Sequence, residues 1–369
     1  MNRMKLGEIL SVKHGWAFKG EYFAEDGEQS ILTPGNFFEK GGFKPNNGKE
    51  RYYTGVYPKE YLCHKGDLIV AMTQQAEGLL GSTALVPEND KYLHNQRIGL
   101  ITCDEKRLNK LFAYYLFMTK SVREQLERSS SGTKVKHTSP EKIYDVEVEI
   151  PDVISQQKIA NLLWSVDEKI ANNKAINDNL SAMAYDIYMH TFFSKKPNAK
   201  LKDILTEAEK SAIQVGEAKT SNGEYPFFTS GATILKWNEP FVDGRNCFLN
   251  TGGNADVKFY VGKAAYSTDT WSISAKSEMS DYLYLMLFSI KPELDQKFFQ
   301  GTGLKHLQKP LLKDRPIYIP EKMELEGFNR QVMPMLDIIS ENTRENQQLT
   351  SLRDWLLPML MNGQATISD

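Results

Sequence analysis

The chain has 369 residues, of which 41% are hydrophobic and 25% are charged, and its formal net charge is −2. This composition is ordinary for a globular protein, and the length suffices for two domains. No run of about 18 apolar residues occurs, so no segment is expected to cross a membrane. The N-terminal residues lack the apolar core and cleavage site of a signal peptide, which makes the cytoplasm the expected compartment.

The sequence contains no recognisable catalytic or cofactor motif. Cys63, Cys103 and Cys247 stand apart from one another, without a CxxC pair or a histidine cluster, so neither a disulfide framework nor a zinc site is predicted. The phosphate-binding GxxxxGK[ST] loop, HExxH, GxSxG and a glycine-rich dinucleotide loop are all missing. We therefore expect no catalytic residue, no bound metal and no cofactor on this chain.

The first 150 residues read as short strands and turns around one helix. Gly66-Asp67 precede the apolar run Leu68–Met72, which predicts a strand after a turn, and Leu111–Met118 have helical spacing. Residues 200–320 are richer in turns. We divide the chain into a first domain at 1–151, a long helix at 152–196, a second domain at 197–320, and a second long helix with a tail at 321–369.

The two long helices are predicted from apolar residues that recur in steps of three and four. The first series is Ile159, Leu163, Val166, Ile170, Asn173, Ile176 and Leu180, and the second is Val332, Leu336, Ile339, Thr343, Asn346, Leu349 and Arg353. Each helix should have about 40 residues and a length of roughly 60 Å. A single stripe of this kind is usually plain core, but two in register favour an intramolecular helix pair.

Three residues inside these series leave alternatives open. Asn173 and Asn346 occupy equivalent positions, where they either form a buried pair that sets the register or lie at a solvated edge. Pro334 either marks the first turn of the second helix or kinks it.

A segment of the first half returns in the second half at one constant offset. SGTKVKHTSPEKIYDVEVEIP (131–151) is matched by GTGLKHLQKPLLKDRPIYIP (301–320). Two copies of one unit imply two copies of one task.

Hydroxyl, backbone N–H, imidazole and ammonium groups together suit phosphate contact. The phosphate candidates are Thr133, Lys134, Lys136 and His137 in the first copy and Thr302, Lys305 and His306 in the second. Both copies lie in positively biased stretches, which are otherwise read as solvated faces.

These residues resemble a known family, the specificity subunits of type I restriction–modification systems. The similarity also includes GDLIVAMTQQAEGLLGSTALVPENDKYLHNQRIGLI (66–101), QQKIANLLWSVDEKI (156–170), YPFFTSGA (225–232), GKAAYSTDTWSI (262–273) and LLPMLMNGQ (356–364). It implies an α+β fold with two globular α/β target recognition domains in pseudo-twofold repeat. Each would be followed by a long helix, and the two helices would pair as an antiparallel coiled coil.

The resemblance also implies function and partners. Each domain would read one part of a bipartite, asymmetric double-stranded DNA target, while the helices space the domains and dock the partner subunits. The chain itself would be non-catalytic. Two methyltransferase subunits would bind S-adenosylmethionine, and two restriction–translocase subunits would use ATP and Mg²⁺. The alternative is a coiled-coil scaffold without sequence-specific DNA binding.

Side chains that can form paired hydrogen bonds with base edges are the candidates for base reading. They are Gln74, Gln75, Asn95, Gln96 and Arg97 in the first half, and Thr229, Ser230, Asn250, Asn254, Thr268 and Asp269 in the second. Each has an alternative role as a turn residue that bonds to its own backbone.

Overall fold

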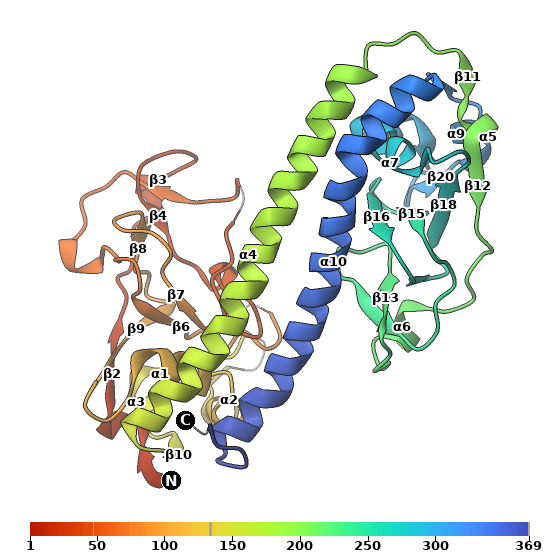
Figure 1. Ribbon diagram of the computed structural model, residues 1–369. Helices are drawn as coiled ribbons and strands as arrows, with labels where there is room; N and C mark the ends of the chain where they lie inside the picture. Colours follow the sequence, from red (N-terminus) through yellow and green to blue (C-terminus); the bar gives the residue numbers. More distant parts are fainter. Residues whose placement is uncertain (47, 75, 133–134, 368–369) are drawn as a thin grey trace. The chain divides into compact units, whose positions relative to one another are not determined.

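The computed structural model describes residues 1–46, 48–74, 76–132 and 135–367 (Figure 1). The chain forms two compact units, residues 1–167 with 350–369 and residues 168–349. Helices α4 (Val153–Thr191) and α10 (Lys322–Met361) each contribute to both units, and they have 39 and 40 residues. The two predicted long helices are confirmed. No helix in the described part of the chain is long and apolar enough to cross a membrane.

The globular part of the first unit is built on a four-stranded sheet in the order β2-β9-β6-β7. A second sheet has the order β3-β5-β4-β8, and β1 pairs with β10. The strands are β1 (Asn2–Lys5), β2 (Leu10–His14), β3 (Phe23–Ala24), β4 (Ser30–Ile31), β5 (Tyr52–Tyr53), β6 (Leu68–Ala71), β7 (Thr83–Leu85), β8 (Tyr92–Leu93), β9 (Ile98–Cys103) and β10 (Glu147–Ile150). The α-helices are α1 (Lys110–Leu116), α2 (Lys120–Ser129) and α3 (Pro140–Tyr144), and short 3₁₀ turns are at Leu6–Glu8, Gly20–Tyr22, Pro34–Asn36 and Lys59–Tyr61.

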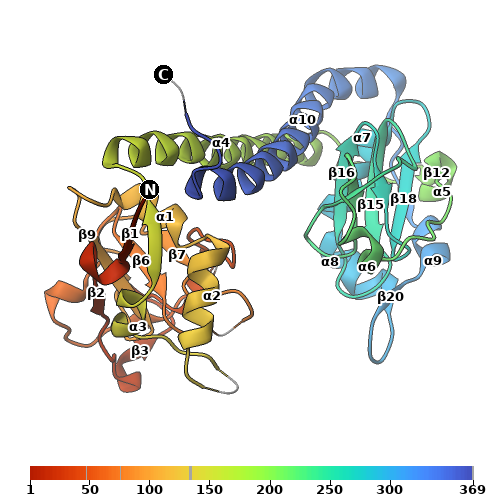
Figure 2. The same ribbon diagram turned by 90° about the horizontal axis from the view of Figure 1, so that it is seen from below.

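The globular part of the second unit repeats this plan with the sheet β12-β18-β15-β16 (Figure 2). Smaller sheets are β14-β13-β17, β11-β21 and β19-β20. The strands are β11 (Ala199–Lys200), β12 (Leu205–Glu207), β13 (Tyr225–Phe228), β14 (Leu235–Trp237), β15 (Arg245–Asn250), β16 (Val257–Val261), β17 (Ala265–Tyr266), β18 (Thr270–Ala275), β19 (Phe299–Gln300), β20 (His306–Leu307) and β21 (Pro316–Ile317). The helices are α5 (Leu201–Ile204), α6 (Val215–Ala218), α7 (Ser280–Ser289), α8 (Lys291–Glu293), a π-helical turn at Leu294–Phe298, and α9 (Lys309–Lys313).

The strand pairings show that the sequence repeat is a repeat of structure. In both units a central strand, β6 or β15, lies between an antiparallel partner that comes later in the chain, β9 or β18, and a hairpin partner, β7 or β16. In both units a parallel pair, β4 with β8 or β13 with β17, belongs to a second sheet. The predicted α+β class with a duplicated domain is therefore confirmed.

The prediction of a single helix in the first 150 residues was wrong. The strand at 68–71 and the helix at 110–116 are confirmed, and Asn109 caps α1 by accepting from the Phe112 N–H at 2.9 Å. Helices α2 and α3 were missed. Only Val122 and Leu126 of α2 are buried, so its ten residues read as a charged tract instead of as a helix with an apolar stripe.

The seam residues pack into the cores of the two globular parts as well as between the helices. Ile159 and Leu163 of α4 belong to the main core of the first unit, with Leu360 of α10. Val332 and Leu336 of α10 belong to the main core of the second unit, with Ile339 packed against it. Val166 and Ile170 are also buried, whereas Leu349 is partly buried and Ile176 is 45% exposed. The prediction that Ile176 is buried in the seam was therefore wrong.

The asparagines pair across the two helices within the second unit. Asn173 is 1% exposed, and its Nδ2 donates to Oδ1 of Asn346 at 3.0 Å and to Glu345 at 2.6 Å. One turn further, Nδ2 of Asn342 donates to Oδ1 of Asn177 at 2.8 Å. Partner numbers fall along α10 as they rise along α4, so the helices are antiparallel. Of the two alternatives, the buried pair is confirmed.

Helix α10 begins well before Pro334. Its first residue is Lys322, so the alternative that Pro334 marks the first turn was wrong. Proline provides no N–H for the carbonyl four residues earlier and clashes with that turn. Figures 1 and 2 both show α10 bent in its N-terminal part, as expected for an internal proline.

Leu163→Asp should prevent folding of the first unit. Leu163 is fully buried, and an unpaired carboxylate there costs several kcal/mol. Leu162→Asp is the matched control, because Leu162 is 38% exposed and tolerates a charge. Urea unfolding followed by circular dichroism compares the two variants. An unfolding curve of Leu163→Asp equal to that of Leu162→Asp would contradict this packing.

Candidate nucleic-acid interface

In the first unit, three loops meet at one end of the central sheet. We call residues 72–74, 95–97 and 135–137 the first loop cluster. The Met72 N–H donates to the carbonyl of Arg97 at 3.0 Å, and the Gln74 N–H donates to the carbonyl of Lys136 at 2.9 Å. Nδ1 of His137 lies 3.1 Å from Oγ1 of Thr73. The loop after β6, the turn before β9 and the repeated Lys-His segment thus form one hydrogen-bonded surface.

The second unit brings the equivalent loops together. The second loop cluster consists of residues 250–254, 267–269 and 304–306. The Thr251 N–H donates to the carbonyl of Asp269 at 2.9 Å, and the Gly253 N–H donates to the carbonyl of Lys305 at 2.9 Å. This arrangement follows from the ladder, because Asn250 at the end of β15 is the Cα partner of Thr270 at the start of β18. Each globular part therefore gathers most of the predicted DNA-binding residues at one end of its central sheet.

In the first loop cluster, two base-reading candidates are free to reach a ligand. Gln96 and Arg97 are exposed, and Gln74 is half-buried. Oδ1 of Asn95 accepts from the Arg97 N–H at 3.2 Å, so this side chain also shapes the turn. Gln75 lies outside the described residues, as do Thr133 and Lys134.

In the second loop cluster, the candidates divide into supports and exposed groups. Asn250 is 3% exposed, and its amide bonds to the backbone of Gly252, Asn254 and Asp256. Asn254 and Asp269 are exposed, and Thr268 is half-buried. Asn250 thus takes the alternative role of a turn residue that supports its own loop.

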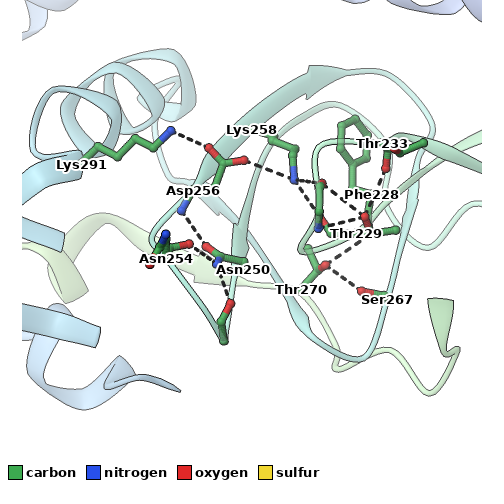
Figure 3. A network of polar contacts seen from close by, with 12 residues as sticks. Phe228, Thr229, Thr233, Asn250, Asn254, Asp256, Lys258, Ser267, Thr270 and Lys291 are labelled. Atoms are coloured by element: carbon green, nitrogen blue, oxygen red, sulfur yellow. Dashed lines mark hydrogen bonds and ion pairs between the residues drawn. The ribbon is translucent and has the colours of Figure 1, made fainter. Parts of the chain in front are cut away.

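The loop after β13 is held beside this cluster by a polar network (Figure 3). Thr229 is buried and bonds to the backbone of Gly231 and Thr233, while Ser230 is half-buried. Nζ of Lys258 donates to the carbonyls of Thr229 and Gly231, each at 2.7 Å. Thr229 therefore also has a supporting role, and the ammonium group of Lys258 binds carbonyl groups of this loop.

Asp256 joins Lys258 to Lys291 in the same network. Its carboxylate lies 3.4 Å from Nζ of Lys258 and 2.7 Å from Nζ of Lys291. Burial raises the pKa of Asp256, but the hydrogen bond and charge of Lys291 more than offset this, and the pKa lies below its ordinary value. Burial is also the main reason why the pKa of Lys258 is lowered. Through these contacts Asp256 and Lys258 hold the loop after β13 in place.

The phosphate candidates lie at the loop clusters but are partly neutralised. Lys136 forms an ion pair with Glu127, and Nζ of Lys305 lies 3.1 Å from a carboxylate oxygen of Asp295. His137, Thr302 and His306 are exposed. Exposed ion pairs of this kind are worth at most about 1 kcal/mol, so a phosphate can replace the carboxylate.

The sequence alone did not indicate Trp16, which lies beside the first loop cluster. The backbone N–H of Trp16 donates to the carbonyl of His94 at 2.9 Å, and the Trp16 carbonyl accepts from the backbone N–H of Gln96 at 3.0 Å. A Cβ at Gly15 would lie 2.1 Å from the Asn95 carbonyl oxygen, so only glycine permits this approach. The Thr268 N–H likewise donates to the carbonyl of Ile213 in the second unit, at 2.9 Å. A Gly-Trp pair directly after a strand was the available signal.

Both units thus bring three loops together at equivalent places on a duplicated sheet, with different side chains in each. Among the described residues, no group of three or more His, Cys, Asp or Glu side chains could hold a metal ion. These features define a class of protein with two related but non-identical recognition surfaces.

Comparisons with known proteins identify the family. The model of the type I restriction modification DNA specificity domain matches residues 1–182 and 195–351. The MjaIX specificity subunit of a type I restriction enzyme from Methanocaldococcus jannaschii is 22% identical over 70% of this chain and 69% of its own length. The MjaVIII specificity subunit from the same organism is 23% identical over 45% of this chain and 39% of its own length. A type I S subunit from M. genitalium has the same fold, with a TM-score of 0.66, 15% identity and coverage of 100% of this chain and 96% of that one.

The chain belongs to the family of type I restriction–modification specificity subunits and has two target recognition domains. The family model covers both globular parts and most of both helices. These comparisons give no support to the alternative of a coiled-coil scaffold without sequence-specific DNA binding.

Lys136→Ala and Lys305→Ala should each weaken binding to all DNA sequences and lower the salt slope by about one, because each removes about one phosphate contact. Gln96→Ala and Arg97→Ala should instead relax discrimination in one half-site, at a cost of roughly 1–3 kcal/mol for each lost paired contact. Glu127→Gln is the matched control, since it frees the charge of Lys136 and should strengthen non-specific binding. Fluorescence anisotropy over a salt series measures these effects. Equal behaviour of the lysine and Gln96/Arg97 variants would refute the division between positioning and reading.

His94 should make the first unit sensitive to acid. It is fully buried, and burial lowers its pKa to about 4, although a hydrogen bond to the Ile98 carbonyl opposes the shift. Between pH 6.5 and 4 the unfolded chain binds a proton that the native state does not bind. The contribution of His94 to the free energy of unfolding is therefore fully present above about pH 6.5, and it falls by about 3 kcal/mol as the pH approaches 4. His94→Gln should reduce this dependence in urea unfolding, and His190→Gln, a substitution at an exposed position, is the control.

Proposed function

We propose that this chain reads a bipartite, asymmetric DNA target, with one half-site bound at each loop cluster. The observation that carries this proposal is the pair of equivalent loop clusters, which expose different side chains. Gln96 and Arg97 occupy the turn before β9, whereas Thr268 and Asp269 occupy the equivalent turn before β18. Arginine and glutamine suit guanine and adenine, whereas an aspartate accepts from the amino group of cytosine. Two different sets of readers favour two different half-sites.

The helix pair would set the unread gap between the half-sites. The Asn173–Asn346 and Asn342–Asn177 hydrogen bonds favour one antiparallel register, which a spacer of defined length requires. Near-neutral net charge suits a subunit whose partners supply part of the phosphate neutralisation.

We further propose that the chain is non-catalytic and works with two methyltransferase and two restriction–translocase subunits. S-adenosylmethionine, ATP and Mg²⁺ would bind to those partners, in the cytoplasm. Because Ile159, Leu163, Val332 and Leu336 are buried in the chain itself, a partner would contact other side chains. In the first unit, Ile154 of α4 and Leu352 and Trp355 of α10 are 72%, 45% and 59% exposed, so these apolar side chains are available to a partner.

The purified chain should neither methylate nor cut DNA. Methylation of adenine at one sequence should appear only after the methyltransferase subunit of the same system and S-adenosylmethionine are added. Incorporation of a tritiated methyl group into a plasmid library, followed by sequencing of modified bases, measures this. Methyl transfer by the isolated, homogeneous chain would overturn the proposal.

Lengthening the helix pair should widen the gap and leave the half-sites unchanged. Four residues inserted in α4 between Asp167 and Glu168, and four in α10 between Leu349 and Thr350, fall at the boundary between the compact units. They add one turn, or roughly 6 Å, against about 3.4 Å for each base pair. The methylated gap should therefore grow by about one or two base pairs. Altered half-site letters with an unchanged gap would defeat the spacer model.

A further inference from the structure

Arg245 connects the central sheet of the second unit to helix α10. It is the first residue of β15, and its side chain is 18% exposed. Nε and Nη2 each donate to the Asp281 carboxylate of α7 at 2.6 Å. Nη1 donates to the Asp337 carboxylate of α10 at 2.5 Å, and Nη2 also donates to the Met333 carbonyl at 3.2 Å. One guanidinium thus fixes a strand and two helices.

The contact on α10 lies at the turn that contains Pro334. Met333 and Asp337 are four residues apart and therefore lie above one another on the same helix face. Arg245 binds the carbonyl of one and the carboxylate of the other. Pro334 offers no N–H to the carbonyl of Arg330, one turn earlier, so the guanidinium restrains the turn that directly follows the missing helix hydrogen bond.

Strand β15 runs from this contact to the second loop cluster. It begins at Arg245 and ends at Asn250, whose amide organises residues 252–256. At about 3.3 Å per residue, the strand spans roughly 17 Å between these two ends. Because β15 is paired on both sides, with β16 and β18, it cannot shift by itself. A movement of Arg245 relative to α10 would therefore be passed on to the loop cluster.

The ionic contact is better suited to orientation than to stability. Asp281 is fully buried, and burial raises its pKa despite the opposing effect of Arg245. The desolvation penalty offsets most of the electrostatic attraction in such a pair, and apolar residues of equal volume often stabilise a protein as well or better. A guanidinium that binds two carboxylates and a carbonyl nevertheless requires one geometry. The first unit is joined to its helices differently, because there Tyr115 of α1 donates to Asp167 of α4 at 2.7 Å and Arg353 of α10 donates to the same carboxylate at 2.7 Å.

We infer that Arg245 is a positioning residue for spacing specificity. By holding β15 to the Met333–Asp337 turn of α10, it fixes the place of the second loop cluster along the helix and thereby the gap length that the protein accepts. This inference rests on the proposed reading of a bipartite target.

The test compares targets that differ only in their gap. The chain is assembled with the methyltransferase subunit of its own system, and kcat/KM for methylation is measured on the wild-type target and on targets with one base pair more or fewer. Arg245→Met should lower the preference for the correct gap by about tenfold. Asp337→Asn keeps the buried Arg245–Asp281 pair and should lower it by a smaller factor. The half-site letters should stay the same in both variants.

Arg315→Met is the matched control. Arg315 is 19% exposed and pairs with Glu293 at 2.9 Å within the globular part, so its loss removes a similar ion pair that does not involve α10. A purely structural defect lowers methylation on all gaps equally and leaves their ratio unchanged, whereas a positioning defect changes the ratio.

An unchanged gap preference in Arg245→Met would overturn the inference, as would altered letters in the second half-site. If Arg245→Met does not fold, Asp337→Asn decides, because Asp337 is 43% exposed and can be replaced without burying a new polar group. A wild-type complex that shows no gap preference would instead overturn the proposed function.

Discussion

The cores of the two globular parts are completed by the long helices, and the rest of the structure depends on this burial. Ile159 and Leu163 of α4 are enclosed in the first core, and Tyr188 of α4 and Val332 of α10 in the second. Without these side chains, each globular part would expose an apolar surface to water, and this exposure costs about 25 cal/mol of free energy for each Å². Each recognition domain is therefore folded and oriented by the same residues that form the helix pair.

Polar groups then select one arrangement among those that apolar packing would allow. Apolar seams tolerate sliding by a heptad, but an asparagine amide that moves away from its partner leaves buried polar atoms unpaired. The Asn173–Asn346 contact opposes such a slip between the helices, and the Arg245 contact opposes it between strand and helix. Both contacts restrict the arrangement of the elements that they join, which the proposed spacing role requires.

The two loop clusters show how one scaffold can hold two different surfaces. Backbone hydrogen bonds between the loops recur in both units, such as Gln74 to Lys136 and Gly253 to Lys305. Because these bonds use main-chain groups, the exposed side chains can differ without loss of the loop framework. Asn250 and Thr229 show the complementary case, in which a side chain replaces missing backbone partners inside one loop. Support thus falls to buried residues of these loops, which leaves the exposed residues available for the proposed base reading.

The sequence by itself determined the duplication, the two long helices, the asparagine positions and the family, because periodicity and internal repeats are properties of the chain. It also indicated most residues of the two loop clusters, since turn residues next to apolar runs lie at sheet edges. Only the tertiary structure decided which candidates are exposed. Asn250 and Gln96 are equally polar in sequence, yet one amide is enclosed by the backbone of its own loop and the other faces solvent. The role of Arg245 was equally hidden, because Asp281 and Asp337 are distant in sequence and meet it only through packing.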